Sequence, residues 1–427
     1  MEYDEDRRET GTEQPERKER GAFGRGMAAG ILAGLLAAGC LSLLWEMPER
    51  FMGILGLQDQ EASVSQGELD REDKINLIES MIDQAFLYET DGEELEEYLY
   101  KGLMAGLNDP YSGYYTKEEF ESLMEETQGV FCGIGVQAMQ SYDTMEASIV
   151  QVYKGSPAEE AGVQKGDIIK EVDGENVESQ NLDDIVSKIK GEEGTVVHIR
   201  FYRPETDAYL EMDLERRQVE VDTVTSHMLD DEIGYLKITN FDDVTKGQFE
   251  QAMGELESQG MEGLILDVRD NPGGLVDCVV EIADQLLPEG TIVYTEDKNG
   301  QGETYESDQE RQFTKPLAVL INGSSASASE ILAGAVKAYG TGTLVGTQTF
   351  GKGIVQNIIP LKDGSAVKMT VSRYFTPDGI CIHGEGIAPD VEVELPAALQ
   401  EETEIPEEED VQLQEALHVV REKMEKE

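Results

Sequence analysis

The chain has 427 residues, with 34 Lys and Arg against 89 Asp and Glu, which gives a formal net charge of −55. A charge of this sign and size repels phosphate backbones and excludes general nucleic-acid binding. Apolar residues make up 39% of the chain, enough for packed cores, and the length allows two or three domains. The four Cys give no disulfide framework, and the four His, without an H-E-x-x-H or C-x-x-C motif, argue against a zinc enzyme.

The first 45 residues predict a membrane anchor. A charged tail, residues 1–26, precedes residues 27–45, which carry no charge. At about 1.5 Å per residue this run matches a hydrocarbon core of about 30 Å. Lys and Arg precede it and Glu follows it, so we expect a cytoplasmic N-terminus and an extracytoplasmic main part. Two alternatives to an anchor are less well supported. A cleaved signal peptide would need an A-x-A-like end, which is missing here, and a lipoprotein signal ending at Cys40 conflicts with an apolar run that continues to Trp45.

Residues 46–70 show little periodicity and are interpreted as a linker before an N-terminal helical region, residues 71–128. Apolar residues at helical spacing predict three helices in that region, at 73–86, 93–107 and 117–126. Nothing in their composition indicates more than a packing scaffold.

A β-rich unit is expected at residues 129–218. Strand-like segments lie at 147–152, 168–172 and 196–201. Between them, apolar residues at i, i+3, i+4 and i+7 predict one main helix, with Asn181 as its cap and the apolar face Leu182, Ile185, Val186 and Ile189.

Residues 219–395 alternate strands with helices, which predicts an α/β domain. The expected helices are 244–257, 276–287 and 328–338, and the expected strands are 233–238, 263–268, 291–294, 317–321, 344–346, 354–360 and 366–374. The acid-rich tail, residues 396–427, is interpreted as solvated surface with a short helix at 411–423.

Two segments of the α/β region are candidates for chemistry. Residues 322–330 (NGSSASASE) lie between a strand and a helix, where a hydroxyl can stand on a sharp turn and backbone N–H groups can stabilise an oxyanion. Lys352 follows between two glycines at the start of an apolar strand. Burial would lower its pKa, and a neutral Lys can accept a proton from a Ser hydroxyl.

Each segment alone leaves alternatives open. Ser-rich turns also cap helices, and Gly-Lys-Gly can bind an anion or simply turn. Spacing does not exclude a Ser-His-Asp triad that uses His227 or His383. Cys278 falls in a mostly apolar helix and is interpreted as a core residue.

Residues 73–423 resemble the C-terminal processing peptidases, or tail-specific proteases, which are serine peptidases with a Ser-Lys centre. The resemblance implies an α/β catalytic core of crotonase/ClpP-like ββα units with an inserted PDZ domain. It is carried by the order and spacing of short motifs: 109–112 (DPYS), 133–135 (GIG), 156–158 (SPA), 270–274 (DNPGG), 325–330 (SASASE), 351–356 (GKGIVQ), 376–379 (TPDG), 386–390 (GIAPD) and 410–413 (DVQL).

The resemblance also implies roles for single residues. Ser327 corresponds to the nucleophile, Lys352 to the general base and Gln356 to the group that orients the Lys. Residues four apart in a strand share a face, so we expect Lys352 and Gln356 to meet. Backbone N–H groups of Ala328 and of Gly273 (or Gly274) would form the oxyanion hole. Ser325 and Ser329 are the alternative nucleophiles.

In the PDZ-like unit, the loop at 131–134 would present backbone N–H groups to a peptide's terminal carboxylate. The peptide would then add as a strand beside Gly135 and Val136. The expected peptide-binding residues are Phe131, Cys132, Gly133, Ile134, Gly135, Val136, Ile185 and Ile189. Because the chain is so acidic, it repels a peptide's terminal carboxylate, and salt screens this repulsion. If backbone N–H groups alone capture the carboxylate, the affinity for the peptide should therefore rise with moderate salt.

We therefore expect a serine endopeptidase anchored in a bacterial cell membrane by one span, with its catalytic domain extracytoplasmic. It would act on protein or peptide substrates with accessible C-termini, and no metal or organic cofactor is implied. A homo-oligomer and a regulatory or adaptor protein stay open as further partners. The alternatives are a catalytically silent PDZ scaffold that binds peptides and a crotonase-like enzyme that handles acyl-CoA.

Overall fold

The computed structural model of the chain describes residues 69–141, 144–229, 232–308, 310–400, 402 and 405–426. The predicted anchor at 27–45 lies outside these residues, and within them no helix is both long and apolar enough to cross a membrane. The chain divides into two units between Glu96 and Glu97. The first contains α2 (Arg71–Ala85) and the beginning of α3 (Gly92–Ala105). Both helices occur where the apolar spacing predicts them.

The second unit continues from α3 through β1 (Gly113–Tyr115) to α4 (Lys117–Gln128). Helix α4 begins with a capping box, in which Thr116 Oγ1 accepts from the Glu119 N–H and the Glu119 carboxylate accepts from the Thr116 N–H. It ends at Gly129, which has the left-handed conformation that favours glycine.

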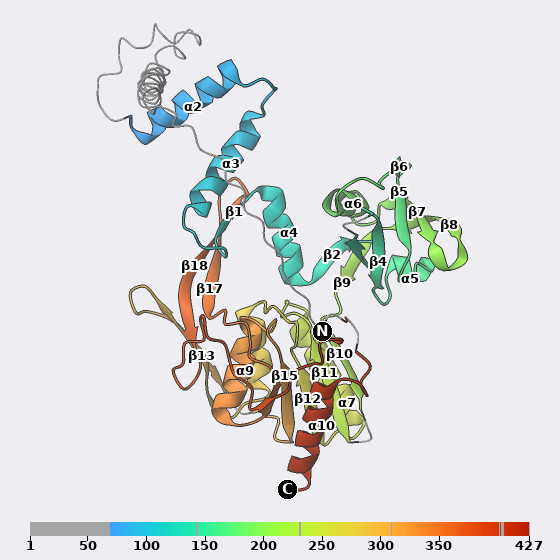
Figure 1. Cartoon of the computed structure of the whole chain (residues 1–427), viewed down its shortest axis with the longest axis vertical. Coiled ribbons are helices and arrows are strands. Elements are labelled where there is room, and N and C mark those ends of the chain that lie inside the picture. Colours follow the sequence, from blue (N-terminus) through green and yellow to red (C-terminus); the bar gives the residue numbers. More distant parts are fainter. Residues whose placement is uncertain are drawn as a thin grey trace, which may run out of the picture. The chain divides into compact units, whose positions relative to one another are not determined.

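The β-rich domain follows α4 (Figure 1). Its main sheet has the order β3-β4-β5-β7-β8, so β3 is an edge strand, and a two-stranded β2–β9 ladder leads into and out of the domain. The elements are β2 (Val130–Gly133), β3 (Val136–Gln140), β4 (Ala147–Val152), α5 (Pro157–Ala161), β5 (Ile168–Val172), β6 (Glu175–Asn176), α6 (Leu182–Ile189), β7 (Val196–Arg203), β8 (Ala208–Glu215) and β9 (Arg217–Glu220).

Helix α6 is the predicted main helix, and it buries Ile185 and Ile189 in the core of this domain. The predicted cap is wrong in one respect. Asn181 stands at the N-cap position, but its side chain makes no capping hydrogen bond.

The α/β domain is built on a six-stranded sheet of order β10-β11-β12-β15-β16-β19, in which β10 is antiparallel to β11 and all other pairs are parallel. The strands are β10 (Val224–Met228), β11 (Ile233–Ile238), β12 (Gly263–Asp267), β15 (Leu317–Ile321), β16 (Thr343–Gly346) and β19 (Val391–Glu392). Its helices are α7 (Thr245–Ser258), α8 (Val276–Asp284), α9 (Ala328–Tyr339) and α10 (Val411–Met424).

Helices cover both faces of this sheet, which explains the continuous apolar runs of its central strands. Leu264 and Leu266 of β12 belong to the cluster that contains α7, α8 and α9. Ile265 between them belongs to the cluster that contains α10. The interpretation of the C-terminal tail as solvated surface is therefore wrong for α10 (Figure 1). This helix buries Leu413, Ala416, Leu417 and Val420 at i, i+3, i+4 and i+7.

A second sheet of order β1-β18-β13-β14, with β17 also paired to β18, completes the domain. Its remaining strands are β13 (Gly290–Asp297), β14 (Thr304–Ser307), β17 (Ile354–Pro360) and β18 (Ala366–Phe375). The register of β17 against β18 shifts between Val355 and Gln356. Among the strands of these two sheets, the sequence patterns missed β1, β10, β14 and β19, each of five residues or fewer. In the β-rich domain they also missed β8, which has eight residues.

Candidate active site

Ser327 stands at the start of α9 in an unusual backbone conformation, with φ 53° and ψ −112°. A positive φ costs free energy for any residue with a Cβ, and such strain persists where the surrounding structure enforces it, often at functional sites. Here Glu330 contributes, because its Oε2 accepts from the Ser327 N–H at 3.0 Å. The sharp turn leaves the Ser327 side chain half-buried beside a cavity.

The two alternative nucleophiles are placed differently. Ser325 is fully buried, and its Oγ donates to the Val268 carbonyl at 2.7 Å. Ser329 is also fully buried, and its Oγ donates to the Asn271 carbonyl at 3.0 Å. Both hydroxyls fix the backbone of the neighbouring turn, so Ser327 is the best placed of the three to meet a substrate.

Lys352 lies in the loop before β17, and Glu330 ties this loop to the serine turn. The Glu330 carboxylate is buried and accepts from the backbone N–H groups of Gly351 (2.7 Å) and Lys352 (2.8 Å) and from Thr349 Oγ1 (2.5 Å). No sequence pattern assigned a separate role to Glu330. Its position three residues after Ser327 was the available signal, because a carboxylate at that position can accept from the N-cap N–H.

The pKa of Lys352 is lowered, chiefly by burial and then by the nearby positive charge of Lys368. The carboxylates of Asp109 and Glu330 act in the opposite direction without reversing the shift. This direction agrees with the one expected for a Lys that acts as a base near neutral pH.

Gln356 lines the same cavity as Ser327 and Lys352. The expectation that Lys352 and Gln356 share one face of a strand is wrong. Lys352 precedes β17, and the register shift between Val355 and Gln356 breaks the alternation of faces. The Gln356 Nε2 donates to the Ile354 carbonyl at 3.2 Å, and within the described residues it has no hydrogen bond to Lys352.

The glycine turn after β12 contacts the serine directly. A Cβ on Gly273 would lie 2.7 Å from the Cβ of Ser327, so glycine is required for this approach. The Gly273 N–H donates to Asn271 Oδ1 at 2.8 Å and is thus already engaged. Gly274 lines the cavity together with Ser327, so Gly274 is the better of the two candidates to join Ala328, the first residue of α9, in an oxyanion hole.

The cavity that contains these groups has a volume of about 230 Å³. Apart from Ser327, Lys352, Gln356 and Lys368 its walls are largely apolar, with contributions from Leu123, Phe241, Leu275, Val276, Ile354 and Ile358. Such a lining suits apolar side chains of an extended peptide next to the hydroxyl.

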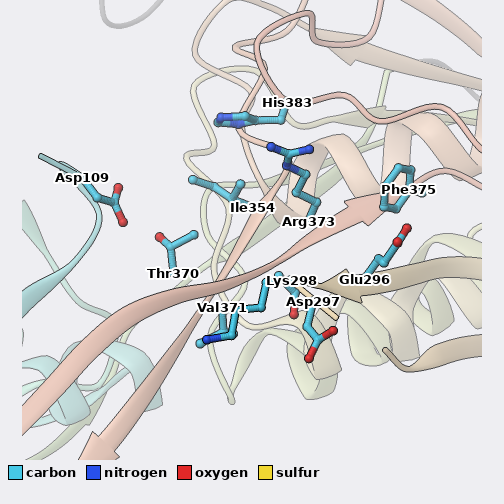
Figure 2. A pocket seen from close by; sticks show the side chains of 11 residues that line it. Asp109, Glu296, Asp297, Lys298, Ile354, Thr370, Val371, Arg373, Phe375 and His383 are labelled. Atoms are coloured by element: carbon cyan, nitrogen blue, oxygen red, sulfur yellow. The ribbon is translucent and has the colours of Figure 1, made fainter. Parts of the chain in front are cut away.

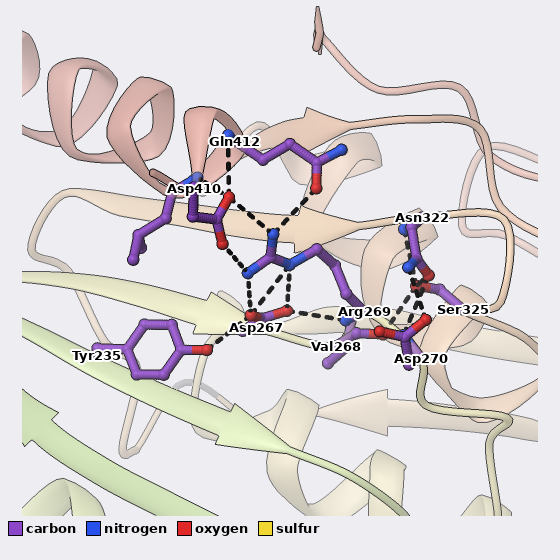
Figure 3. A network of polar contacts seen from close by, with 10 residues as sticks. Tyr235, Asp267, Val268, Arg269, Asp270, Asn322, Ser325, Asp410 and Gln412 are labelled. Atoms are coloured by element: carbon purple, nitrogen blue, oxygen red, sulfur yellow. Dashed lines mark hydrogen bonds and ion pairs between the residues drawn. The ribbon is translucent and has the colours of Figure 1, made fainter. Parts of the chain in front are cut away.

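A buried polar network supports the glycine turn from the other side (Figure 3). Arg269, two residues after the end of β12, pairs with Asp267 at 2.6 Å and with Asp410, the N-cap residue of α10, at 2.8 Å. Asp270 and Asn322 join the glycine turn to the serine turn, with the Asp270 N–H donating to Asn322 Oδ1 at 3.0 Å and Asn322 Nδ2 donating to Asp270 Oδ1 at 2.8 Å. The C-terminal helix is thereby connected to the segment that precedes Gly273.

A second cavity of about 590 Å³ shares Ile354 with the first one. Its lining is mostly polar, and Figure 2 shows the Arg373 guanidinium close to the His383 ring, with Asp109 on another wall. Of the two His that spacing left open, His383 lines this second cavity, and His227 bonds to Glu407 at 2.7 Å.

Other candidate groups have structural environments. Cys278 is buried, which raises the pKa of its thiol to about 12, as expected for a core residue. In the part of the chain that the structure describes, no group of three or more His, Cys, Asp or Glu side chains is placed to hold a metal ion.

The β-rich domain has a largely apolar groove of about 280 Å³ between β3 and α6. Phe131, Gly133, Ile134, Gly135, Val136 and Ile189 line it as expected, together with Val186. Cys132 and Ile185 are not part of its lining, and Ile185 is buried in the core instead. Because β3 is an edge strand, its free side can accept a further strand.

The groove also contains a cation, Lys190, that no sequence motif indicated. Lys190 follows α6, lines the groove and pairs with Glu125 of α4 at 2.7 Å. Glu125 and Glu126 also line the groove, so Lys190 can bind a peptide carboxylate beside the backbone N–H groups only by exchanging its pair with Glu125. The position of Lys190 one residue after the predicted helix was the available signal.

Comparison with known proteins gives two family matches. The model for peptidase family S41 matches residues 232–393, and the model for a PDZ domain matches residues 148–203. The carboxy-terminal processing protease CtpA of Bacillus subtilis is 38% identical over 325 residues, which are 76% of this chain and 69% of the relative. The carboxyl-terminal-processing protease of Synechocystis sp. is 37% identical over 322 residues, which are 74% and 75% of the two chains.

Two solved structures are also similar. The photosystem II D1 C-terminal processing protease is 31% identical with a TM-score of 0.45, and the match covers 75% of this chain and 86% of that one. A Bacteroides fragilis protein assigned to the S41 proteases has a TM-score of 0.50 at 17% identity, with 81% and 97% of the chains covered, which is a likeness of fold.

Proposed function

The chain belongs to peptidase family S41, among the carboxy-terminal processing proteases with a PDZ domain, and on that basis we propose that it cleaves peptide bonds through a Ser327–Lys352 acyl-enzyme mechanism. The observation that carries the proposal is the common cavity of Ser327, Lys352 and Gly274. Ser327 stands there on a strained turn, while Ser325 and Ser329 are buried and bonded to backbone carbonyls.

In the first step the Ser327 Oγ attacks the scissile carbonyl carbon while neutral Lys352 accepts the hydroxyl proton. The carbonyl oxygen gains the negative charge, which the N–H groups of Ala328 and Gly274 stabilise. The ammonium of Lys352 then returns its proton to the leaving amine as the C–N bond breaks. In the second step Lys352 takes a proton from water as the water oxygen attacks the ester carbon. The Lys352 ammonium then gives this proton to Ser327 Oγ as the C–Oγ bond breaks and the acid product leaves.

Gln356 acts in this scheme as a polar group of the same cavity that orients the Lys352 amine. In the described structure its amide bonds to the Ile354 carbonyl, so this role requires the Gln356 side chain to turn toward Lys352 when substrate binds. Catalytic hydrogen bonds are often absent or long before substrate is bound.

The PDZ domain selects the substrate by its C-terminus. The terminal residues of an unstructured protein add to the free edge of β3, with an apolar side chain in the groove beside Val186 and Ile189. The terminal carboxylate lies at the end of the groove where Gly133, Gly135 and Lys190 are found.

The uncharged run at 27–45 supports a further part of the proposal, a single-pass anchor in a bacterial cell membrane with the catalytic domain extracytoplasmic. Extraction of membranes at alkaline pH and digestion of intact cells with an external protease test it. The proposal requires a chain that stays with the membrane and is cut from outside.

The catalytic proposal is tested by replacing Ser327 with Ala and measuring cleavage of an unstructured peptide with an apolar C-terminus. Ser324→Ala is the matched control, because Ser324 is an exposed serine of the same turn. We expect loss of turnover for Ser327→Ala and wild-type turnover for Ser324→Ala. Full activity of Ser327→Ala would overturn the mechanism, and binding without turnover by the wild type would identify a peptide-binding scaffold instead.

A further inference from the structure

The amine of Lys352 lies over an aromatic ring from a distant part of the chain. Its Nζ is 4.8 Å from the ring centre of Tyr111, which is half-buried. This distance is within the range in which the face of an aromatic ring attracts an ammonium group. In the described residues Lys352 Nζ has no ion pair, so Tyr111 is the group seen to hold the amine end of the side chain.

Tyr111 is held in place by the turn that contains it. The Asp109 carboxylate accepts from the Tyr111 N–H at 3.1 Å and from the Ser112 hydroxyl at 2.5 Å. The Ser112 Oγ in turn accepts from the Thr370 N–H of β18 at 3.0 Å. The following residues form β1, which is paired along its length with β18.

Strand β18 also supports the two proposed catalytic residues. The hydroxyl of its Tyr374, a buried residue, donates to the backbone carbonyl of Ser327 at 2.9 Å and contacts the backbone carbonyl of Lys352. One strand therefore fixes the backbone of the serine, the backbone of the lysine and the turn that brings the ring to the amine.

The charged groups around the amine explain why a ring is suitable here. Lys368 on β18, Asp109 on the turn and Glu330 on α9 act electrostatically on Lys352. Asp109 is occupied by its own turn, and Glu330 accepts from the serine and lysine loops. A carboxylate paired with the amine would stabilise the ammonium strongly and keep it protonated, whereas a ring face stabilises the ammonium more weakly, so it positions the amine and still allows it to give up its proton.

We propose that Tyr111 is a positioning residue for the peptidase reaction, because its ring holds the amine of Lys352 in the active-site cavity. The proposal rests on the Ser327–Lys352 mechanism. When Ser327 attacks, Lys352 becomes an ammonium ion facing the ring, and it returns to the neutral amine when the proton passes to the leaving nitrogen. The turn at 109–112 thereby belongs to the active site, because it holds the ring of Tyr111 against the Lys352 amine.

The test varies the ring without changing its shape. Phenylalanine and its mono-, di- and trifluorinated analogues are placed at position 111, and the pH dependence of kcat/KM is measured for an unstructured peptide. Fluorine withdraws charge from the ring face, so the ammonium is stabilised less. The acid limb of the profile, which reports deprotonation of Lys352, should move stepwise to lower pH as fluorine is added.

Simple substitutions complete the test. Tyr111→Phe should keep kcat within about threefold of the wild type, and Tyr111→Leu should lower kcat about tenfold or more with little change in KM, because the amine loses its position. Tyr115→Leu, another half-buried Tyr of the same segment, is the matched control for local destabilisation and should keep kcat. The fluorinated series remains informative even if Tyr111→Leu does not fold.

An acid limb that stays at one pH across the fluorinated series would overturn the role of Tyr111. So would a kcat of Tyr111→Leu within about twofold of the wild type. If wild-type enzyme cleaves the peptide and Ser327→Ala does not, these results reject Tyr111 alone. Equal cleavage by wild type and Ser327→Ala rejects the mechanism and the positioning role together.

Discussion

Replacing Glu330 with Gln should disconnect the serine turn from the lysine loop. The buried carboxylate accepts four hydrogen bonds, two on each oxygen. Oε1 serves Thr349 Oγ1 and the Gly351 N–H, and Oε2 serves the N–H groups of Ser327 and Lys352. A Gln side chain keeps one oxygen and places an NH₂ group at the other position, where it faces two donors and can accept from neither.

The size of the effect follows from these contacts. Each buried donor left without an acceptor costs about 1–3 kcal/mol, so Glu330→Gln should destabilise the domain by about 2–6 kcal/mol. This is a large part of the stability of a typical domain, about 5–15 kcal/mol. A displacement of about 1 Å in either loop is enough to lower the rate about 100-fold, so we expect a loss of kcat/KM of at least that size.

The assay combines unfolding in urea with peptide cleavage at a temperature where the variant is folded. Glu257→Gln is the matched control, because Glu257 is an exposed glutamate of α7, and it should change the unfolding free energy by less than about 0.5 kcal/mol. If Glu330→Gln unfolds within about 1 kcal/mol of the wild type and cleaves the peptide within about threefold of its rate, then Glu330 does not connect the two loops as described.

Three further predictions concern other residues of the chain. Gly273→Ala should lower the peptidase activity about tenfold or more, because its methyl group would lie 2.7 Å from the Cβ of Ser327. Gly260→Ala is the control, because Gly260 also has a positive φ but open space around it, and this variant should keep the activity. Lys368→Met removes a positive charge that lowers the pKa of Lys352, so the acid limb of kcat/KM should move to higher pH, and an unmoved limb would refute the electrostatic role. Burial raises the pKa of Asp242 to about 6, so the folded state binds this proton more tightly and stability falls as pH rises from about 4 to about 6. In urea unfolding, Asp242→Asn should therefore have a free energy of unfolding up to about 3 kcal/mol above that of the wild type at pH 8, and no such gain at pH 4. Equal gains at both pH values would contradict this prediction.

The regular elements of the α/β domain could be predicted because their signals are local. The apolar runs at 263–268 and 317–321 match β12 and β15, which are covered on both faces. Helix α10 was expected, but its burial was not, since the surrounding acid-rich sequence suggested a solvated surface. Its apolar residues at i, i+3, i+4 and i+7, from Leu413 to Val420, already contained the signal for a packed face.

The arrangement within the site was less accessible to sequence reasoning. The resemblance carried by the motifs assigned Ser327, Lys352 and Gln356 to one catalytic centre, and in the structure these residues line one cavity. The relation of Lys352 to Gln356 was misjudged because a shift of strand register leaves no periodic signal. Only the contact of Glu330 with the Ser327 N–H had a spacing signal. The contacts of Glu330 with the lysine loop and of Tyr111 with Lys352 join segments that meet only in the folded chain, and no spacing rule predicts them.

The most direct test of the Ser327–Lys352 mechanism is the mass of the enzyme during turnover. A slowly hydrolysed peptide ester is mixed with the full chain, the reaction is quenched in acid, and the adduct is mapped by peptide mass spectrometry. The mechanism predicts an acyl group on Ser327 that is absent from Ser327→Ala and that forms far more slowly in Lys352→Ala, where the Ser327 hydroxyl lacks its base. An acyl group on Ser325, Ser329 or Cys278, or turnover by Ser327→Ala at the wild-type rate, would contradict it.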